Sequence, residues 1–403
     1  MKFKKNVVLA AMLPAGLVFA QNSLAYDVVP AGQPVVTGEP SRVGAPWNHR
    51  STFNIPGTNT DVAFGGYIKL DALYDLDYDQ GIVTDPFSVT DEDNKTSGRT
   101  TFTAAESRLN FRTQTHTDQG TISTYVEGHF VPDESFNLRH AYGEFGGFLA
   151  GKTWSNFMQM VGSPRTLKLG NPIGYTFERQ PQVRYTWRGD NGFFAVALED
   201  SNTSVVSSAG IPVASESPLP DLTLRYQYGR SFGISGIVRE LATNEYQAAV
   251  DDSTLGYGIV ARAALPLGDR LVLKGNTMLG SGLGNYLNVI PEAAEAMRTP
   301  DAVIVGNRLE SVDFQSYGAS LEYRWTQDWS SAIGTSYLTQ DLPENVAGLQ
   351  GFVDNMQFSY ANLIWDVNER LAVGAEFQYT ELERLNGESL DASRIQASAL
   401  FQF

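Results

Sequence analysis

From residue 62 to its end, the chain alternates between apolar and polar positions. Residues 182–188 show the pattern: Val183, Tyr185 and Trp187 share one phase, and Gln182, Arg184, Thr186 and Arg188 share the other. Side chains of a strand point alternately to its two faces, so this period of two predicts strands with one apolar and one polar face. The same pattern recurs in residues 64–74, 108–112, 122–130, 222–228, 255–265, 317–325 and 394–403. The sequence therefore predicts an all-β chain.

Short and long connections alternate between these strands. Short turns are expected at residues 117–120, 146–147, 189–192, 229–230, 266–269, 326–328 and 366–369. Longer polar segments lie at residues 75–98, 131–135, 155–181, 201–220, 242–253, 282–310, 341–353 and 385–389, and residues 291–297 could form a short helix in one of them. Strict alternation places all short turns on one rim and all long loops on the other, as in bacterial outer-membrane barrels, whereas a sandwich has no reason to segregate its loops. We expect a transmembrane antiparallel β-barrel of about 16 strands.

The last strand agrees with a membrane barrel. Its apolar phase ends in aromatic residues and contains Ile395, Ala397, Ala399, Phe401 and the terminal Phe403. A C-terminal aromatic strand of this kind resembles the signal by which bacterial barrel-assembly machinery recognises its clients.

The N-terminus predicts export. Lys2, Lys4 and Lys5 precede an apolar run from residue 7 to residue 20, followed by small residues suited to cleavage, so residues 1–25 are expected to be a signal peptide. A buried N-terminal helix is the alternative. Residues 26–61 are rich in Pro, Gly and Asn and are expected to form a periplasmic or lumenal lead-in segment, which leaves residues 62–403 for the barrel.

Composition narrows the class of protein. The mean hydropathy is −0.21 and no later run of about 18 apolar residues exists, which excludes a helical membrane protein. The absence of cysteine excludes disulfides and thiolate sites. The net charge of −16 becomes −19 when the three signal lysines are removed, and an acidic chain is a poor partner for nucleic acid. His49, His116, His129 and His140 lack metal-ligand spacing, so we expect no metal and no cofactor.

The acids gather in the predicted loops, whereas arginines occupy the water-facing phase of the strands. Cations that line a narrow passage favour anions, and the planar fork of arginine pairs two oxygens at once, which suits carboxylates. We expect residues 155–181 to fold into the lumen and narrow it. The predicted pore-lining cations are Arg108, Arg112, Arg139, Arg165, Lys168, Arg179, Arg184, Arg188 and Arg225. The alternative for any one of them is a structural pairing with lumen acids such as Glu106, Glu127 and Glu144.

Several motifs in the first half of the chain resemble those of the DcaP-like porins. They are FNIPGT (residues 53–58), GGYIKLD (65–71), ESRL (106–109), LRHAY (138–142), GKTWSNF (151–157) and RQPQVRY (179–185). The resemblance implies a homotrimeric barrel in the outer membrane of a Gram-negative bacterium that takes up dicarboxylates and similar small anions. Some relatives carry a periplasmic coiled coil before the barrel, but residues 26–60 show no heptads.

We therefore expect an outer-membrane pore, not an enzyme, that passes small organic anions passively and has outer-membrane lipid as its other partner. Two alternatives remain open at this point. One is a non-conducting structural or adhesive barrel whose loops bind a surface partner. The other is a barrel enzyme that acts on lipids, although nothing in the sequence pairs a serine with a base.

Overall fold

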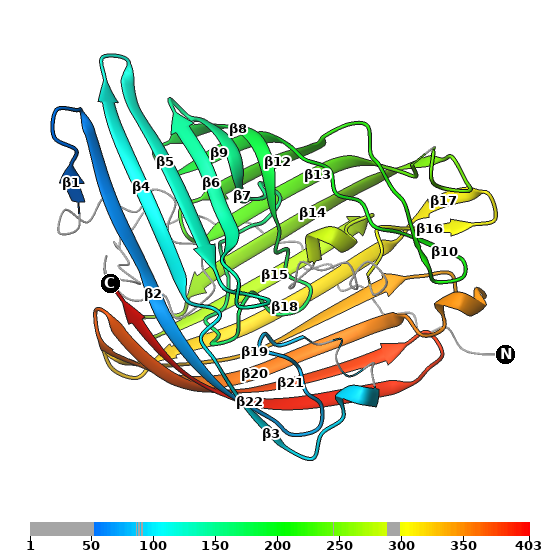
Figure 1. Ribbon diagram of the computed structural model, residues 1–403. Helices are drawn as coiled ribbons and strands as arrows, with labels where there is room; N and C mark the ends of the chain where they lie inside the picture. Colours follow the sequence, from blue (N-terminus) through cyan, green and yellow to red (C-terminus); the bar gives the residue numbers. More distant parts are fainter. Residues whose placement is uncertain (1–51, 86, 88, 90–91, 245, 288–298) are drawn as a thin grey trace.

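Sixteen antiparallel strands close into a barrel in the computed structural model, which describes residues 52–85, 87, 89, 92–244, 246–287 and 299–403 (Figure 1). The barrel strands are β2 (Thr60–Asp75), β4 (Arg108–Thr117), β5 (Gly120–His129), β6 (Asn137–Phe145), β7 (Phe148–Trp154), β8 (Arg179–Gly189), β9 (Gly192–Glu199), β12 (Asp221–Tyr228), β13 (Phe232–Ala242), β14 (Ser253–Pro266), β15 (Leu271–Ser281), β18 (Asp313–Arg324), β19 (Trp329–Asp341), β20 (Val353–Asn368), β21 (Leu371–Arg384) and β22 (Ser389–Gln402). The predicted strand number is confirmed. The predicted signal peptide, most of the lead-in segment and the short helix at residues 291–297 lie outside the described residues.

The barrel closes between its first and last strands. Strand β2 pairs with β22 from Tyr67 opposite Gln402 to Asp75 opposite Arg394. On its other side β2 pairs first with β4 and then with β3 (Arg99–Thr103). A short strand, β1 (Thr52–Asn54), pairs with the start of β2. No sheet edge is left open along the seam, as a membrane barrel requires.

The predicted alternation is confirmed, with the apolar phase outside. On β8, Val183 and Trp187 are exposed whereas Gln182 is buried; on β12, Leu222 and Leu224 are exposed whereas Thr223 is buried. This is the inverse of a water-soluble protein, because the outer surface faces lipid and the polar phase faces the lumen. Among the described residues, no helix is long and apolar enough to cross a membrane.

Connections of two lengths separate the two ends of the barrel. Every described connection on the rim that carries the C-terminus is a short turn, and we call this the short-turn rim. The opposite, long-loop rim carries a second sheet, the rim sheet, made of β10 (Val205–Ser207), β11 (Pro212–Val213), β16 (Ala302–Val305) and β17 (Arg308–Ser311). The described loops also hold three short 3-10 helices, η3 (Glu92–Asn94), η4 (Gly284–Leu287) and η6 (Ala347–Leu349).

A buried ion-pair cluster joins the rim sheet to the barrel. Arg239 of β13 lies 3.1 Å from the Asp221 carboxylate and 3.2 Å from that of Asp301, which precedes β16. Asp301 also accepts a hydrogen bond from the Ser204 amide, which precedes β10. One guanidinium therefore ties two long loops to the wall.

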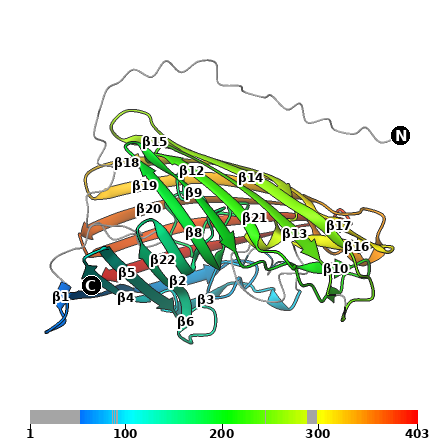
Figure 2. The same cartoon turned by 90° about the horizontal axis from the view of Figure 1, so that it is seen from above.

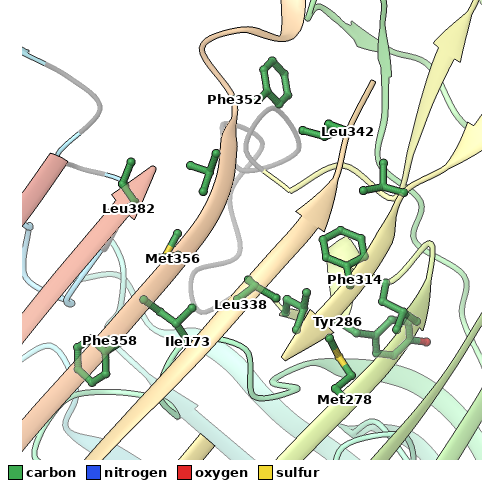
Figure 3. Packing of buried hydrophobic residues seen from close by; sticks show 14 of the residues in the cluster. Ile173, Met278, Tyr286, Phe314, Leu338, Leu342, Phe352, Met356, Phe358 and Leu382 are labelled. Carbon is green, nitrogen blue, oxygen red and sulfur yellow. The ribbon is translucent and has the colours of Figure 1, made fainter. Parts of the chain in front are cut away.

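The wall is asymmetric. Strands β4–β9 and β12, the short wall, have seven to 11 residues, whereas β13–β15 and β18–β22, the long wall, have 11 to 16. In Figure 2, β8 and β9 of the short wall lie on the side of the barrel opposite β20 and β21 of the long wall. The main apolar core lies inside the long wall, where Met278, Phe314, Leu338 and Met356 belong to one cluster with Ile173 of the long β7–β8 connection (Figure 3).

Candidate functional site: the lumen and its inward loop

Residues 155–178, which we call the inward loop, connect β7 to β8 and fold into the barrel as predicted. Nearly all of its side chains are buried. The loop is shorter than the predicted segment 155–181 because β8 begins at Arg179, so Arg179 belongs to the wall. A long segment without regular structure can stay ordered inside a barrel only if its backbone polar groups find partners there.

Those partners follow one another around the wall. The Asn156 side chain donates to carbonyl oxygens of β9 and β12, and that of Gln159 donates to Ser235 of β13. The Lys274 amine of β15 donates to the Ser163 carbonyl oxygen over 2.8 Å, and the Arg165 amide donates to Glu322 of β18 over 2.7 Å. The outgoing half of the loop thus runs along the inner face of the long wall.

The tip of the loop is fixed where the barrel closes. The Leu167 amide donates to the Glu376 carboxylate of β21 over 2.7 Å, and the Leu167 carbonyl oxygen accepts from Lys69 of β2 and Gln396 of β22. The returning half uses the long wall again, because the Gly174 carbonyl oxygen accepts from Ser316 of β18 over 2.6 Å. The loop therefore covers the inner face of β13–β15 and β18–β22.

The predicted cations Arg112, Arg184 and Arg188 lie on β4 and β8 of the short wall. Arg112 is half-buried, and its guanidinium lies 4.6 Å from the centre of the Tyr125 ring. Arg184 is half-buried opposite Leu149 of β7, and Arg188 is exposed beside the short-turn rim. The short wall therefore presents cations toward the side of the lumen that faces the inward loop.

Arg108 and Arg139 are buried around one carboxylate. The Arg139 Nε lies 3.1 Å from Glu127, whereas an Arg108 nitrogen lies 3.8 Å from the same carboxylate. A shift in register between β5 and β6 at Glu127 brings Arg139 and the neighbouring His140 into the same buried cluster, as a β-bulge does. Both arginines therefore stabilise the wall through Glu127. This arrangement corresponds to the alternative in which a lumen arginine pairs with a lumen acid.

Arg179 and Arg225 make a different kind of contact. The Arg179 guanidinium lies 4.5 Å from the Trp154 ring centre and 5.7 Å from that of Phe177. The Arg225 guanidinium lies 5.2 Å from the Phe193 ring centre and donates to the Gln227 side chain over 2.8 Å. Aromatic faces attract these two cations through the ring quadrupole.

Of the two predicted cations of the inward loop, Arg165 bonds to the long wall and Lys168 bonds to the loop itself. Arg165 donates to Asp366 over 2.6 Å and to Ser330 over 2.7 Å. The Lys168 amine donates to the carbonyl oxygens of Leu169 and Asn171, and burial lowers the pKa of this amine to about 8. Both side chains stabilise the conformation of the loop.

The carboxylates that anchor the inward loop were not predicted. Glu322, Asp366 and Glu376 accept from its backbone or from Arg165, and Glu199 accepts from the Asn156 amide. All four lie in strands of the barrel, at or near the water-facing phase of the alternation. An acid at a water-facing position of a strand is a sequence signal for such an anchor, but nothing in the sequence indicates which residue of the inward loop it binds.

Comparison with known proteins agrees with this architecture. The sequence profile described as "Porin subfamily" matches residues 50–396. The chain is 27% identical to Porin Omp2a of Brucella melitensis over 251 residues, which are 56% of this chain and 63% of that protein. The match thus spans less than two thirds of this relative's length.

Three solved structures share the fold. The outer membrane channel DcaP of Acinetobacter baumannii has a TM-score of 0.75 and 20% identity, covering 88% of this chain and 100% of that one. An anion-selective porin from Comamonas acidovorans gives 0.58 and 10%, covering 85% and 100%. OmpT of Vibrio cholerae in a trimer form gives 0.55 and 12%, covering 85% and 99%.

The match to the family profile covers most of the chain, the resemblance to DcaP-like porins found in the sequence is confirmed in the fold, and the barrel is of the outer-membrane type. This chain belongs to the porin subfamily.

Proposed function

We propose that this porin allows passive uptake of small organic anions, dicarboxylates among them, through the space between the inward loop and the short wall. One observation carries the proposal. Arg112, Arg179 and Arg184 are half-buried on the short wall, and no carboxylate of the described residues lies within 4.0 Å of their guanidinium groups. The cations of the inward loop, in contrast, are used to hold the loop.

Electrostatics supports this choice of solute. Charges inside a barrel act through a low-dielectric surrounding, which strengthens the potential that a permeating ion meets. A guanidinium without a carboxylate partner leaves its positive potential in the passage, and its fork matches the two oxygens of a carboxylate. The Comamonas acidovorans porin, which has the same fold, is anion-selective, and this supports the same preference here.

Reversal potentials across a planar bilayer under a salt gradient test the proposal. We expect the purified protein to conduct and to prefer chloride to potassium. The double substitution R112A/R184A should lower this preference several-fold, whereas R308A, which removes an exposed arginine from the rim sheet, should leave it unchanged. A protein that never conducts, or that prefers cations, would overturn the proposal.

Solute competition extends the test to the substrate class. A dicarboxylate such as succinate should reduce chloride conductance at lower concentration than a monocarboxylate of similar size, because it offers two groups to the arginines of the short wall. An uncharged analogue serves as the control. Equal effects of all three solutes would exclude specific recognition of carboxylates.

We also propose that the protein is a homotrimer, that residues 1–25 are removed on export and that residues 26–61 precede the barrel as a lead-in segment. The short strands β4–β9 support the first point, because they form a low stretch of wall suited to contact between copies. Mass measurement of the protein isolated from outer membranes tests the second. A mature chain that still contains Lys2, Lys4 and Lys5 would exclude cleavage.

A further inference from the structure

Among the lumen arginines, two groups differ in the partner that holds them. Arg139, Arg165, Arg239 and Arg394 lie against carboxylates, at N–O distances from 2.6 to 3.2 Å. Arg112, Arg179 and Arg225 instead lie over aromatic rings, at 4.5 to 5.2 Å from the nearest ring centre, and the described residues place no carboxylate within 4.0 Å of them.

The two kinds of partner have different electrostatic consequences. A carboxylate stabilises a buried guanidinium but cancels its charge, so an ion pair contributes little potential to the passage. An aromatic ring stabilises the same cation through its quadrupole, and the attraction grows when the contact is shielded from water. The ring carries no net charge, so the arginine keeps its full positive charge toward a solute.

The rings lie where the alternation otherwise places polar side chains. Tyr125 and Phe193 point into the lumen, while their neighbours Val126 and Phe194 are exposed on the lipid face. Trp154 ends β7 where the inward loop begins, and its ring centre lies 4.5 Å from the Arg179 guanidinium and 5.6 Å from that of Arg139. Phe177 approaches Trp154 at 4.8 Å and adds a second ring beside Arg179.

We propose that Tyr125, Trp154 and Phe193 are positioning residues for solute selectivity, which hold Arg112, Arg179 and Arg225 in place without neutralising them. The inference rests on the proposed function, since it explains how an acidic chain maintains unpaired cations at its passage. Hydrogen bonding alone does not fix these side chains, because Arg179 Nε and Nη1 and Arg225 Nε are buried without a hydrogen-bond partner. The aromatic faces therefore supply most of the contact that orients them.

The pair of Phe193 and Arg225 provides the clearest test. The Phe193 ring contacts the Arg225 guanidinium, whereas the Trp154 ring contacts two guanidinium groups, those of Arg139 and Arg179. We expect F193L to lower the anion-to-cation permeability ratio by about two- to fivefold, the equivalent of a modest cation–π contact, whereas F193Y keeps the ring and the ratio. In an R225Q background, F193L should cause no further loss, because the ring acts through that guanidinium. The variants W154L and W154F test the contact between Trp154 and Arg179 by the same comparison of permeability ratios.

Y360L is the matched control, since Tyr360 is a buried lumen aromatic of the long wall that stacks on Phe358 at 6.1 Å. Folding of each variant is checked by the shift of the unheated barrel on a denaturing gel, and F193M replaces F193L if the latter does not fold. Unchanged selectivity in F193L and W154L, or an equal loss in the presence and absence of Arg225, would overturn the inference. An unsubstituted protein that prefers cations would instead overturn the proposed function.

Discussion

Single charges inside this barrel serve either the wall or the passage, and the neighbours of each charge decide which. Lys69 lies 3.4 Å from Asp71, contacts Glu106 and donates to the Leu167 carbonyl oxygen, so it belongs to the anchor of the inward loop. Arg184 is half-buried with no such partner among the described carboxylates. Residues of the same charge and the same phase of alternation thus have different roles.

Alternation predicts which face of a strand an arginine occupies, but not whether it has a partner. Arg165 and Asp366 are 201 positions apart, and Arg394 and Asp75 are 319 apart. Such contacts depend on the closure of the barrel and on the path of the inward loop, neither of which leaves a local pattern. For this reason the sequence predicts Arg165 and Lys168 as pore-lining cations, although Arg165 hydrogen-bonds to Asp366 and Lys168 to carbonyl oxygens of the loop.

The charge of the passage should depend on pH. Burial raises the pKa of Glu178 to about 7 and lowers that of Lys168 to about 8. As pH rises from about 6 to about 9, Glu178 gains a negative charge and Lys168 loses a positive one, so both changes weaken the positive potential. We expect the anion-to-cation permeability ratio, measured from reversal potentials, to fall over this range.

The variant E178Q isolates the first of these two transitions. It should remove the part of the change centred near pH 7 and leave the part near pH 8. A permeability ratio that increases with pH would contradict the assignment of both groups.

Gly151 of β7 cannot accept a side chain without cost. Its φ is +130°, and an added Cβ would meet the Ala141 carbonyl oxygen and approach the Tyr142 Cα at 2.6 Å. We expect G151A to lower the free energy of unfolding by about 2 kcal/mol or more, because both backbone strain and steric overlap arise. Denaturant-induced unfolding followed by tryptophan fluorescence measures this.

Gly143 of the neighbouring strand is the control. An added Cβ at Gly143 would lie 3.7 Å from the Ser123 carbonyl oxygen, an ordinary contact distance. The free energy of unfolding of G143A should therefore be close to that of the unsubstituted protein. Equal losses of stability in G143A and G151A would show that the close approach of Gly151 to β6 does not cause the loss.

At the scale of elements, the inward loop is the part that the passage depends on. Its hydrogen bonds involve strands of both walls, among them β12, β15 and β18, so no single bond holds it. Glu376 is nevertheless a central anchor, because its carboxylate accepts from the Leu167 amide, the Lys168 amide and the Asn362 side chain.

Removing this carboxylate should loosen the loop. E376A leaves two buried amides without their acceptor, at a cost of about 1–3 kcal/mol for each unsatisfied group. We expect a larger and noisier single-channel conductance, since the tip of the loop can then leave the wall. E381A, which removes an exposed acid from the same strand, is the control, and a conductance that E376A leaves unchanged would show that the other bonds suffice.

Most elements were predictable because strand pattern and loop length are local properties. The sequence predicted the period-two segments, the two rims and the inward loop. It did not predict the rim sheet, in which β10 pairs in parallel with β16 almost a hundred positions away. The sequence also did not predict the register shift at Glu127, which turns both Arg139 and His140 inward. A β-bulge breaks the period of two on which the prediction of strand faces rests.

For the whole molecule, the difference between the two sides of the wall suggests how copies assemble. The short wall exposes Val183 and Trp187 on β8, and the long wall exposes Ile333 on β19. If the trimer forms through the short wall, V183Q should weaken it, because a polar side chain at the centre of the contact loses apolar burial.

The control is I333Q, which places the same side chain at a similarly exposed position on the long wall and has the same expected cost toward lipid. Gel mobility without heating, together with mass measurement in detergent, separates trimer from monomer. Loss of the trimer in I333Q but not in V183Q would move the interface to the opposite side of the barrel.

The junction of β2 with β22 has a consequence for biogenesis. The backbone amide of Phe403 donates to the Gly66 carbonyl oxygen over 3.2 Å, so β2, the first strand of the barrel, finds this partner only when β22 has been synthesised. A chain that lacks β22 carries two unsatisfied edges, on β2 and on β21, which hydrocarbon does not tolerate. We therefore expect the earlier strands to stay out of the bilayer until β22 is available to close the seam.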